Sequence, residues 1–452
     1  MPRRPNRINA HDSAVYRQKF KGFFILACVA FCVLALRMWH LQVIKGEEMA
    51  QRSEINSVRF CKIRPLRGLI TDRYGNVLVD NQPSFDIVFT PDKNRDLKVV
   101  TGRLQSLYRE QSLQFTEDFN RLYEEKTYAP IRLDKNVDAK KLALVETRSL
   151  DLPGVGIDVV PTRQYLYGEM MAHLIGYVGE ISSVELRKKN FEGYQAGDIV
   201  GKYGIEKFFD SYLKGINGGE EVEVNAHGKK IRSLRKVDPT QGYHLHLTID
   251  ASLQQTAWDA FEGRPGAAVV MDTRTGEILA LVSSPSFDPN LFNGGISHRE
   301  WRKLSTNPFH PMENRAISGQ YPPGSTYKLV VAAAALEEKM ITPESSVTCD
   351  GTFQLGNRLF RCWQKKGHGR MNLHQAIVES CDVYFYHLGK QLGVDKIAYY
   401  ARAFGFGAPT GLTLAREKGG IVPTKAWKLS KTRQAWQAGE TISVSIGQGF
   451  NL

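Results

Sequence analysis

One long apolar segment opens the chain, and the remainder alternates between shorter apolar and polar runs. Residues 22–36 (GFFILACVAFCVLAL) contain no charged side chain. Fifteen helical residues rise only about 22 Å, less than the ~30 Å hydrocarbon core of a bilayer. If Arg37 extends its charge to the membrane surface and Trp39 lies at the interface, the span reaches about twenty residues. The pattern therefore predicts a transmembrane helix over residues 22–41.

Basic residues before this segment predict its orientation. Residues 1–21 carry six Lys or Arg side chains and one Asp, and such a basic flank stays in the cytoplasm. A cleavable signal peptide would need a small-x-small site after the apolar run, and residues 35–38 (ALRM) offer none. A lipoprotein site at Ala27-Cys28 would require the apolar run to stop there, but it continues. We expect a signal anchor with everything beyond it exported.

The first exported part has the pattern of a mixed α/β domain. Residues 46–60 suit an amphipathic helix leaving the membrane, and residues 65–91 predict a β-hairpin around the turn sequence Y-G-N. Charged and apolar positions alternate at helical spacing in residues 95–150. A polar Pro/Gly segment at 235–243 marks a boundary. We expect this domain to cover residues 42–238.

The pattern is sharper from residue 239 to residue 452. Residues 244–250 (HLHLTID) predict a strand, residues 251–263 an amphipathic helix, and residues 267–286 a hairpin of two apolar strands. Strand, helix and hairpin in that order build a sheet with a helical face. The sequence therefore predicts an α+β multidomain protein behind an N-terminal transmembrane helix.

Composition agrees with a globular chain and removes one class of partner. The 452 residues are 42% hydrophobic and 24% charged, which favours two or three folded domains. The net charge is +13, of which residues 1–21 supply +5, so the rest has a modest basic bias of +8. Without an Arg-rich helix or zinc-finger spacing, no nucleic-acid partner is expected.

Residues 321–328 (YPPGSTYK) carry the first chemical motif. They run directly into the apolar sequence LVVAAAALEE, which is strongly helical, whereas Pro-Pro-Gly is not. Ser325 is therefore predicted at the first turn of a buried helix, where the helix N-terminus favours a developing negative charge. Lys328, three residues on, lies on the same face. This pattern predicts a serine acyl-transfer nucleophile with a lysine base.

Ser380-Cys381-Asp382 forms a second motif, in a predicted loop between an amphipathic segment and an aromatic-rich helix. The Ser380 hydroxyl can relay a proton between Lys328 and a leaving amine, and Asp382 can position either the substrate amide or Lys328. An S-x-x-K motif occurs together with S-D-N and K-T-G in penicillin-recognising enzymes.

With these motifs the sequence resembles the class B penicillin-binding proteins, and within them the elongation type, penicillin-binding protein 2. The resemblance covers nearly the whole chain, including RGLITDRYGN, GKYGIEKFFDSYLKG, GEILALVSSPSFDPN and ISGQYPPGSTYKL. It implies that Ser325 is acylated, that Lys328 is its base, and that Ser380 and Asp382 form the second active-site box. Asp382 stands where many relatives have asparagine. The implied domains are a pedestal or dimerisation domain and a serine β-lactamase-like transpeptidase domain.

The same resemblance implies a peptidoglycan D,D-transpeptidase that cross-links stem peptides during cell-wall elongation and is a target of β-lactams. It implies an inner-membrane protein with its bulk in the periplasm, working with a SEDS-family glycan polymerase and other elongation proteins. One alternative is a hydrolase of the D,D-carboxypeptidase or β-lactamase kind, although the long pedestal argues against it. Another is an inactive scaffold that only contacts the polymerase.

The third box of the family, K-[ST]-G, is absent from the sequence. Lys431-Thr432-Arg433 is the nearest string, and it lacks the glycine. The final residues, GETISVSIGQGFNL, resemble the family segment that precedes this box. We therefore expect Leu452 to be followed by further sequence in the intact protein, and the transpeptidase domain to be incomplete and inactive without it.

Three of the six cysteines cluster with one histidine. The four residues are Cys349, Cys362, His368 and Cys381. Three thiols and an imidazole form a tetrahedral zinc ligand set, in which Asp350 could replace Cys349. Some penicillin-binding protein 2 relatives resemble this, with Asp, His and Cys ligands. The main alternative is a Cys349–Cys362 disulfide, which an oxidising exported compartment favours, and free buried thiols are a third.

Overall fold

The computed structural model describes residues 10–45, 58–89, 97–108, 131–224, 230–412, 414 and 417–452. The chain forms two compact units, each treated separately below. Unit 1 comprises residues 1–65, 84–160 and 216–240, and unit 2 comprises residues 66–83, 161–215 and 241–452. The predicted domain limits, at residues 21, 41 and 238, stay predictions.

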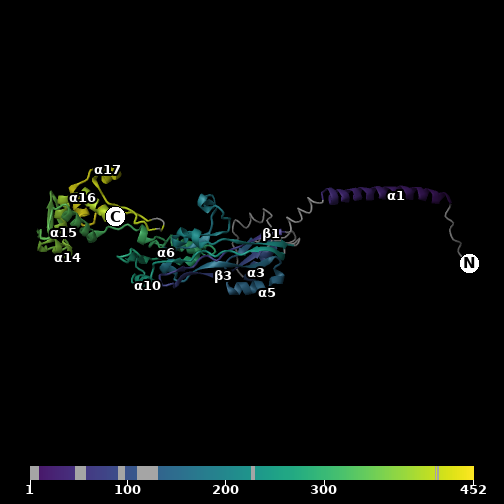
Figure 1. Cartoon of the computed structure of the whole chain (residues 1–452), viewed down its shortest axis with the longest axis horizontal. Helices are drawn as coiled ribbons and strands as arrows, with labels where there is room; N and C mark the ends of the chain where they lie inside the picture. The colour runs from purple at the N-terminus through teal and green to yellow at the C-terminus, as the bar shows by residue number, and fades with distance from the viewer. Residues whose placement is uncertain are drawn as a thin grey trace. The chain divides into compact units, whose positions relative to one another are not determined.

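The predicted membrane anchor is part of one long helix. Helix α1 covers Ala10–Trp39 and continues as a π-helical turn, His40–Ile44 (Figure 1). Phe23–Ile44 is long and apolar enough to cross a membrane, and no part of it is buried in the protein. The predicted amphipathic helix over residues 46–60 lies mostly outside the described residues, and its last three residues begin a strand instead.

A three-stranded antiparallel sheet in unit 1 joins residues far apart in sequence. Its order is β1 (Val58–Ile63), β8 (Gly218–Val224) and β9 (Lys230–Val237). Acidic residues of β8 face basic residues of β9, and Arg232 Nε lies 2.6 Å from the Glu223 carboxylate. Opposite charges across the two strands therefore support their pairing.

The other part of unit 1 has its own apolar core. Helices α3 and α5 confirm the helical spacing over residues 97–108 and 139–147. Residues 109–130 lie outside the described residues, and residues 131–134 form strand β4 instead, which pairs with the second half of β3. Buried Phe89, Leu104 and Leu152 are among the core residues. The elements are α3 (Leu97–Tyr108), β4 (Ile131–Asp134), α5 (Ala139–Thr147), η2 (Ser149–Asp151) and β5 (Val155–Tyr165).

The predicted β-hairpin of residues 65–91 is confirmed. Strand β2 (Ile70–Thr71) pairs antiparallel with β3 (Val77–Phe89). The Asp72 carboxylate shapes the turn, because its Oδ1 accepts hydrogen bonds from the backbone N–H groups of Tyr74 and Asn76, each at 2.9 Å. The strand predicted at residues 244–250 is shorter than expected, since β10 covers only two residues beside β2; they are Leu245–His246.

A buried ionic cluster in unit 2 was not predicted. Glu206 is fully buried, and its two carboxylate oxygens accept from Arg67 Nε and Arg163 Nε, each at 2.6 Å. Arg67 also pairs with Asp210 at 2.8 Å. The surrounding elements are η3 (Gly168–Met171), α6 (Ala172–Ile175), β6 (Val178–Glu180), α7 (Ser183–Leu186), η4 (Lys189–Phe191), β7 (Ile199–Gly201), α8 (Gly204–Phe208) and α9 (Asp210–Leu213).

The predicted order of helix and hairpin in unit 2 is confirmed. Helix α10 (Ala251–Asp259) precedes the antiparallel strands β11 (Gly266–Met271) and β12 (Ile278–Ser284). Gln254 is fully buried and joins the helix to β12, since its side-chain amide bonds to both the N–H and the carbonyl of Leu281 at 2.7 and 2.9 Å.

The largest apolar core lies among the later helices of unit 2, drawn in green and yellow in Figure 1. Helix α13 packs against α15 and α16, and α15 also packs against α18. The elements are η5 (Pro289–Phe292), α11 (His298–Ser305), α12 (Arg315–Ser318), η6 (Gly324–Tyr327), α13 (Lys328–Glu337), β13 (Val347–Cys349), β14 (Thr352–Leu355), β15 (Arg358–Arg361), β16 (Gly369–Met371), α14 (Leu373–Val378), α15 (Asp382–Leu392), α16 (Val394–Ala403), α17 (Lys425–Thr432) and α18 (Ala438–Val444).

Candidate active site

Ser325 lies where the sequence predicted it, at the start of a buried helical segment. The first turn is a 3-10 turn, Gly324–Tyr327, and the α-helix α13 begins at Lys328. The apolar run after Lys328 explains the position, because alanine and valine side chains of α13 are buried in the core. Lys328 is itself only 3% exposed. A cation so well buried requires partners.

Lys328 finds those partners in the second motif. Its Nζ donates to the Ser380 carbonyl at 2.8 Å, to Ser380 Oγ at 3.0 Å and to Asp382 Oδ1 at 2.7 Å. An ammonium group has three donors, and here each has its own acceptor. The two predicted motifs, separated by fifty-two positions, therefore meet at one atom.

Ser380 connects the lysine to Ser325. The two hydroxyl oxygens are 3.0 Å apart, and among the described residues no direct hydrogen bond joins Lys328 to Ser325. Ser380 lies between α14 and α15, as predicted, with a left-handed φ of 50°. That conformation is unusual for a residue with a side chain. In this conformation the carbonyl oxygen and the hydroxyl oxygen of Ser380 both accept hydrogen bonds from Lys328 Nζ.

Trp363 holds the other oxygen of Asp382 and was not predicted from the sequence. Its backbone N–H donates to Asp382 Oδ2 at 3.1 Å, and its indole Nε1 donates to the Glu379 carbonyl at 3.0 Å. Each Asp382 oxygen therefore has a separate partner. The only sequence signal is that Trp363 follows Cys362. A hydrogen bond donated by a backbone N–H cannot be predicted from the type of side chain at that position.

Gly447 supports the turn that carries Ser325. Its carbonyl accepts the Gly324 N–H at 2.9 Å. Its φ is +72°, and a Cβ added there would lie 2.1 Å from the Gly324 carbonyl oxygen. A side chain at this position would push the two segments apart. The sequence S-I-G-Q-G shows that glycines gather here, but not what they contact.

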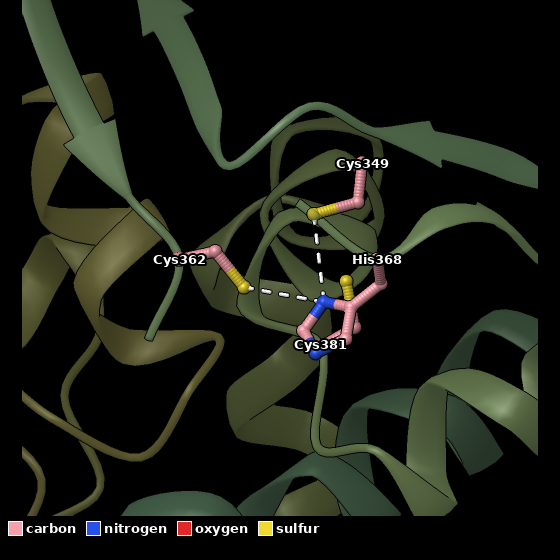
Figure 2. Close-up of side chains that lie close together, drawn as sticks. All are labelled: Cys349, Cys362, His368 and Cys381. Carbon is pink, nitrogen blue, oxygen red and sulfur yellow. Dashed lines mark hydrogen bonds between the residues drawn. The ribbon is translucent and has the colours of Figure 1, made fainter. Parts of the chain in front are cut away.

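The predicted metal ligands come together in a compact cluster. The ligand atoms of Cys349, Cys362, His368 and Cys381 all lie within 4.8 Å of one another. His368 Nδ1 is 3.6 Å from each of the Cys349 and Cys362 sulfurs. Figure 2 marks both contacts with dashed lines. The three cysteines are buried and not joined by disulfides. Asp350 instead bonds to Thr352, with its Oδ1 accepting the backbone N–H at 3.0 Å.

These distances suit a tetrahedral metal site. With Zn–S of about 2.3 Å and Zn–N of about 2.0–2.1 Å, neighbouring sulfur and nitrogen ligands would be about 3.6 Å apart. Burial raises the pKa of the Cys381 thiol to about 12, so a bound cation would have to displace its proton. The cluster could bind a metal ion, and it adjoins the Ser380 loop because Cys381 belongs to both.

Comparison with known families agrees with this geometry. Residues 62–247 match the penicillin-binding protein dimerisation domain, and residues 266–452 match the penicillin-binding protein transpeptidase domain. The predicted fold class is thereby confirmed, with an apolar helix before a pedestal and a transpeptidase domain of mixed α/β structure.

Individual relatives extend the match to almost the whole chain. The peptidoglycan D,D-transpeptidase MrdA of Acinetobacter baumannii is 38% identical over 97% of the chain, which spans 66% of that relative's length. MrdA of Escherichia coli K12 is 35% identical over 97% of the chain and 70% of the relative. The penicillin-binding protein 2–MreC complex from Helicobacter pylori matches with a TM-score of 0.76 at 32% identity, over 87% of this chain and 74% of that one. A peptidoglycan synthase complex matches with a TM-score of 0.66 at 32% identity, over 95% and 74%. The chain therefore belongs to the class B penicillin-binding proteins of the penicillin-binding protein 2 (MrdA) type.

Proposed function

We propose that the protein is a peptidoglycan D,D-transpeptidase that cross-links stem peptides through an acyl-enzyme on Ser325. The observation that carries this proposal is the hydrogen-bonded path from Ser325 Oγ through Ser380 Oγ to Lys328 Nζ. A serine hydroxyl at its free pKa is a weak nucleophile, and a base connected to it through one hydroxyl can activate it. The relatives' shared D,D-transpeptidase activity supports the same reaction.

In the proposed reaction, Ser325 Oγ attacks the carbonyl of the D-Ala-D-Ala bond. Lys328 acts in its amine form, after one ammonium proton has been lost to water, and it accepts the Ser325 proton through Ser380. The same path then returns a proton to the leaving D-Ala amine. An amino group of a neighbouring stem peptide then attacks the ester and releases Ser325. Asp382, held by the Trp363 N–H, keeps the Lys328 side chain in place for both transfers.

A fluorescent penicillin tests the proposal directly. In the complete protein, the label should attach covalently, and Ser325→Ala should abolish labelling. The control is Ser305→Ala, which removes an exposed hydroxyl on α11 and should label normally. Undiminished labelling of the Ser325 variant would remove the assignment. Formation of cross-linked dimers from purified stem-peptide substrates would separate transpeptidation from simple release of D-Ala by a hydrolase.

The Cys349, Cys362, His368 and Cys381 cluster is proposed to hold one structural zinc ion. The 3.6 Å ligand separations and the free thiols support this. With four protein ligands, the ion would keep no position for a reactive water. Its proposed effect is to fix the turns that carry Cys381 and Cys362, and therefore the neighbouring Asp382 and Trp363. It takes no part in proton transfer.

The proposed location is the inner membrane, with residues 1–21 in the cytoplasm and the domains in the periplasm. The basic flank and the apolar helix Phe23–Ile44 support this topology. A reporter fused after residue 60 should behave as periplasmic. Recovery of a soluble form that begins near residue 38 would show a cleaved signal instead.

Stem peptides, β-lactams and elongation proteins are the proposed partners. One similar protein forms a complex with MreC, and another belongs to a complex described as coordinating polymerization and crosslinking. A SEDS-family glycan polymerase and an MreC-like protein are therefore proposed to bind this chain. Co-purification from detergent-solubilised membranes tests both.

A further inference from the structure

A second buried lysine in unit 2 has no part in the proposed proton path. Lys428 is 3% exposed and is the buried residue of the short helix α17 (Lys425–Thr432). Its apolar neighbours in the helix are less buried, since Trp427 is half-buried and Leu429 is exposed, so burial of this cation is not a by-product of an apolar helix face. The location of its partners is therefore informative.

Those partners lie before and after one segment of the chain, residues 441–449, which begins with the end of helix α18 (Ala438–Val444). The Lys428 ammonium group pairs with the Glu440 carboxylate and donates to the Ala435 carbonyl at 3.1 Å. It also lies 6.0 Å from the ring centre of Trp436 and 5.9 Å from that of Phe450. A cation at these distances is attracted to the ring faces. One charge thus contacts residues before and after the segment 441–449.

Further contacts tie this segment to the same group. Glu440 lies in the first turn of α18, where its second carboxylate oxygen accepts the Gln437 N–H at 2.8 Å. The Trp436 indole donates to Thr441 Oγ1 at 2.8 Å. The Trp436 ring contacts Phe450, with 6.1 Å between ring centres. Both ends of the segment are therefore fixed around the Lys428 ammonium group.

The middle of the segment reaches the proposed nucleophile. Gly447, between Glu440 and Phe450, accepts the Gly324 N–H at 2.9 Å. Gly324 is the residue immediately before Ser325. At the other side, α18 packs so closely on α15 that a Cβ added to Gly389 would lie 2.5 Å from the Ser445 Cβ. A shift of α18 would therefore move the support of the Ser325 turn.

We propose that Lys428 is a positioning residue for acylation, holding Gly447 against Gly324 through its contacts with Glu440 and Phe450. This inference rests on the proposed function of Ser325 and adds a residue that touches neither substrate nor nucleophile. Lysine suits the role because a buried ammonium group tolerates few arrangements, since each lost partner leaves a charge without compensation. An apolar side chain would allow the two ends of the segment to slide.

The test compares Lys428→Met with Lys431→Met in the complete protein. Both variants remove an ammonium group from α17, but Lys431 is exposed. We expect K428M to lower the rate constant of the acylation step by about ten- to a hundredfold, as a small misplacement of reacting groups does. The non-covalent affinity for penicillin should change little. K431M should react as the wild type does.

Hydrogen exchange at the Gly324 amide separates positioning from general destabilisation. In K428M this amide should exchange faster at a temperature where the protein is folded, and in K431M it should not. Wild-type acylation by folded K428M, or slow acylation with unchanged Gly324 exchange, would overturn the inference. If K428M does not fold, Glu440→Gln takes its place, with the same two readouts and a smaller expected loss. A wild-type acylation rate together with wild-type exchange of the Gly324 amide in folded E440Q would equally overturn the inference. Labelling of the Ser325→Ala variant would instead show that the proposed function is wrong, whatever the Gly324 exchange.

Discussion

Lys328 and Lys428 are equally buried in unit 2, yet their surroundings differ in one respect. Each is 3% exposed and each pairs with a carboxylate, Asp382 or Glu440. Lys328 also bonds to the Ser380 hydroxyl, which leads to Ser325. Around Lys428 the remaining contacts are a carbonyl and two aromatic ring faces.

This difference separates a lysine that can move protons from one that can only hold a charge. A hydroxyl both donates and accepts, so a proton can pass through it in either direction. Carbonyls only accept, and ring faces attract the cation without accepting a proton from a neighbour. Burial and ion pairing alone therefore do not identify a catalytic lysine. A hydrogen bond from the lysine to a hydroxyl that leads to the nucleophile does.

The strongest test of this distinction is Lys328→Met. Because the variant removes the proton acceptor, acylation by penicillin should fall by about 10³-fold, within the range for general bases. Stability should also fall, because the Asp382 carboxylate loses its buried counter-charge, so acylation is compared where the variant stays folded. The time course of labelling with fluorescent penicillin measures the acylation rate, and thermal unfolding measures the stability. Equal losses of acylation in K328M and K428M would contradict the distinction.

Loss of the metal site should have a smaller effect, transmitted through Asp382. Cys362→Ser removes one proposed ligand immediately before Trp363, whose N–H holds Asp382 Oδ2. We expect about one zinc per wild-type chain and much less in the variant, with acylation slower by about tenfold. Elemental analysis under non-chelating conditions and labelling rates give the two numbers.

The control for the metal prediction is Cys61→Ser, which changes an exposed cysteine outside the cluster. Its zinc content and labelling should match the wild type. Near-zero zinc in the wild type, together with a Cys349–Cys362 crosslink found by mass spectrometry, would establish the disulfide in place of the metal.

The sequence located the residues of the candidate site but not the links between them. Ser325 and Lys328 share one helical turn, so spacing alone places them together. The second motif was associated with them through known motif pairs. Ser380 lies between Ser325 and Lys328 because its backbone is left-handed, and no pattern of residue types predicts that conformation.

Contacts made by backbone atoms, and contacts between distant residues, were missed for a common physical reason. Any residue except proline can supply the N–H that Trp363 gives to Asp382, so its identity carries no information. Arg67 and Glu206 are separated by 139 positions. In the sequence, nothing distinguishes Lys428 from the exposed Lys425 and Lys431 of the same helix. Hydrophobic periodicity predicted the helices and the hairpins well because it depends only on near neighbours.

The buried cluster around Glu206 should affect stability without affecting acylation. Glu206→Gln removes the charge between Arg67 and Arg163, and breaking such a buried pair costs about 3–5 kcal/mol. While the protein stays folded, its labelling rate should equal that of the wild type. Half-buried Glu300 pairs with exposed Lys303 on α11, and this pair is open to solvent, so E300Q should cost less than about 1 kcal/mol. A large loss of acylation in folded E206Q would show that buried charges outside the Ser325 region also position the nucleophile.

The smallest expected effect concerns His173, a buried basic group without a carboxylate partner. Burial lowers its pKa from 6.5 to about 4, and the charge of Arg315 acts in the same direction. Above pH 6.5 the imidazole is neutral in both folded and unfolded chains, so it contributes no pH dependence. Below pH 6.5 the unfolded chain binds a proton that the folded protein does not, so stability falls with pH until about pH 4. The loss at pH 5 is on the order of 2 kcal/mol. His173→Phe keeps an aromatic ring against Phe287 and should make the free energy of unfolding fall less between pH 7 and pH 5, measured by urea denaturation. Exposed His298→Phe should retain the wild-type pH dependence, and an unchanged slope in H173F would show that His173 can be protonated inside the folded protein.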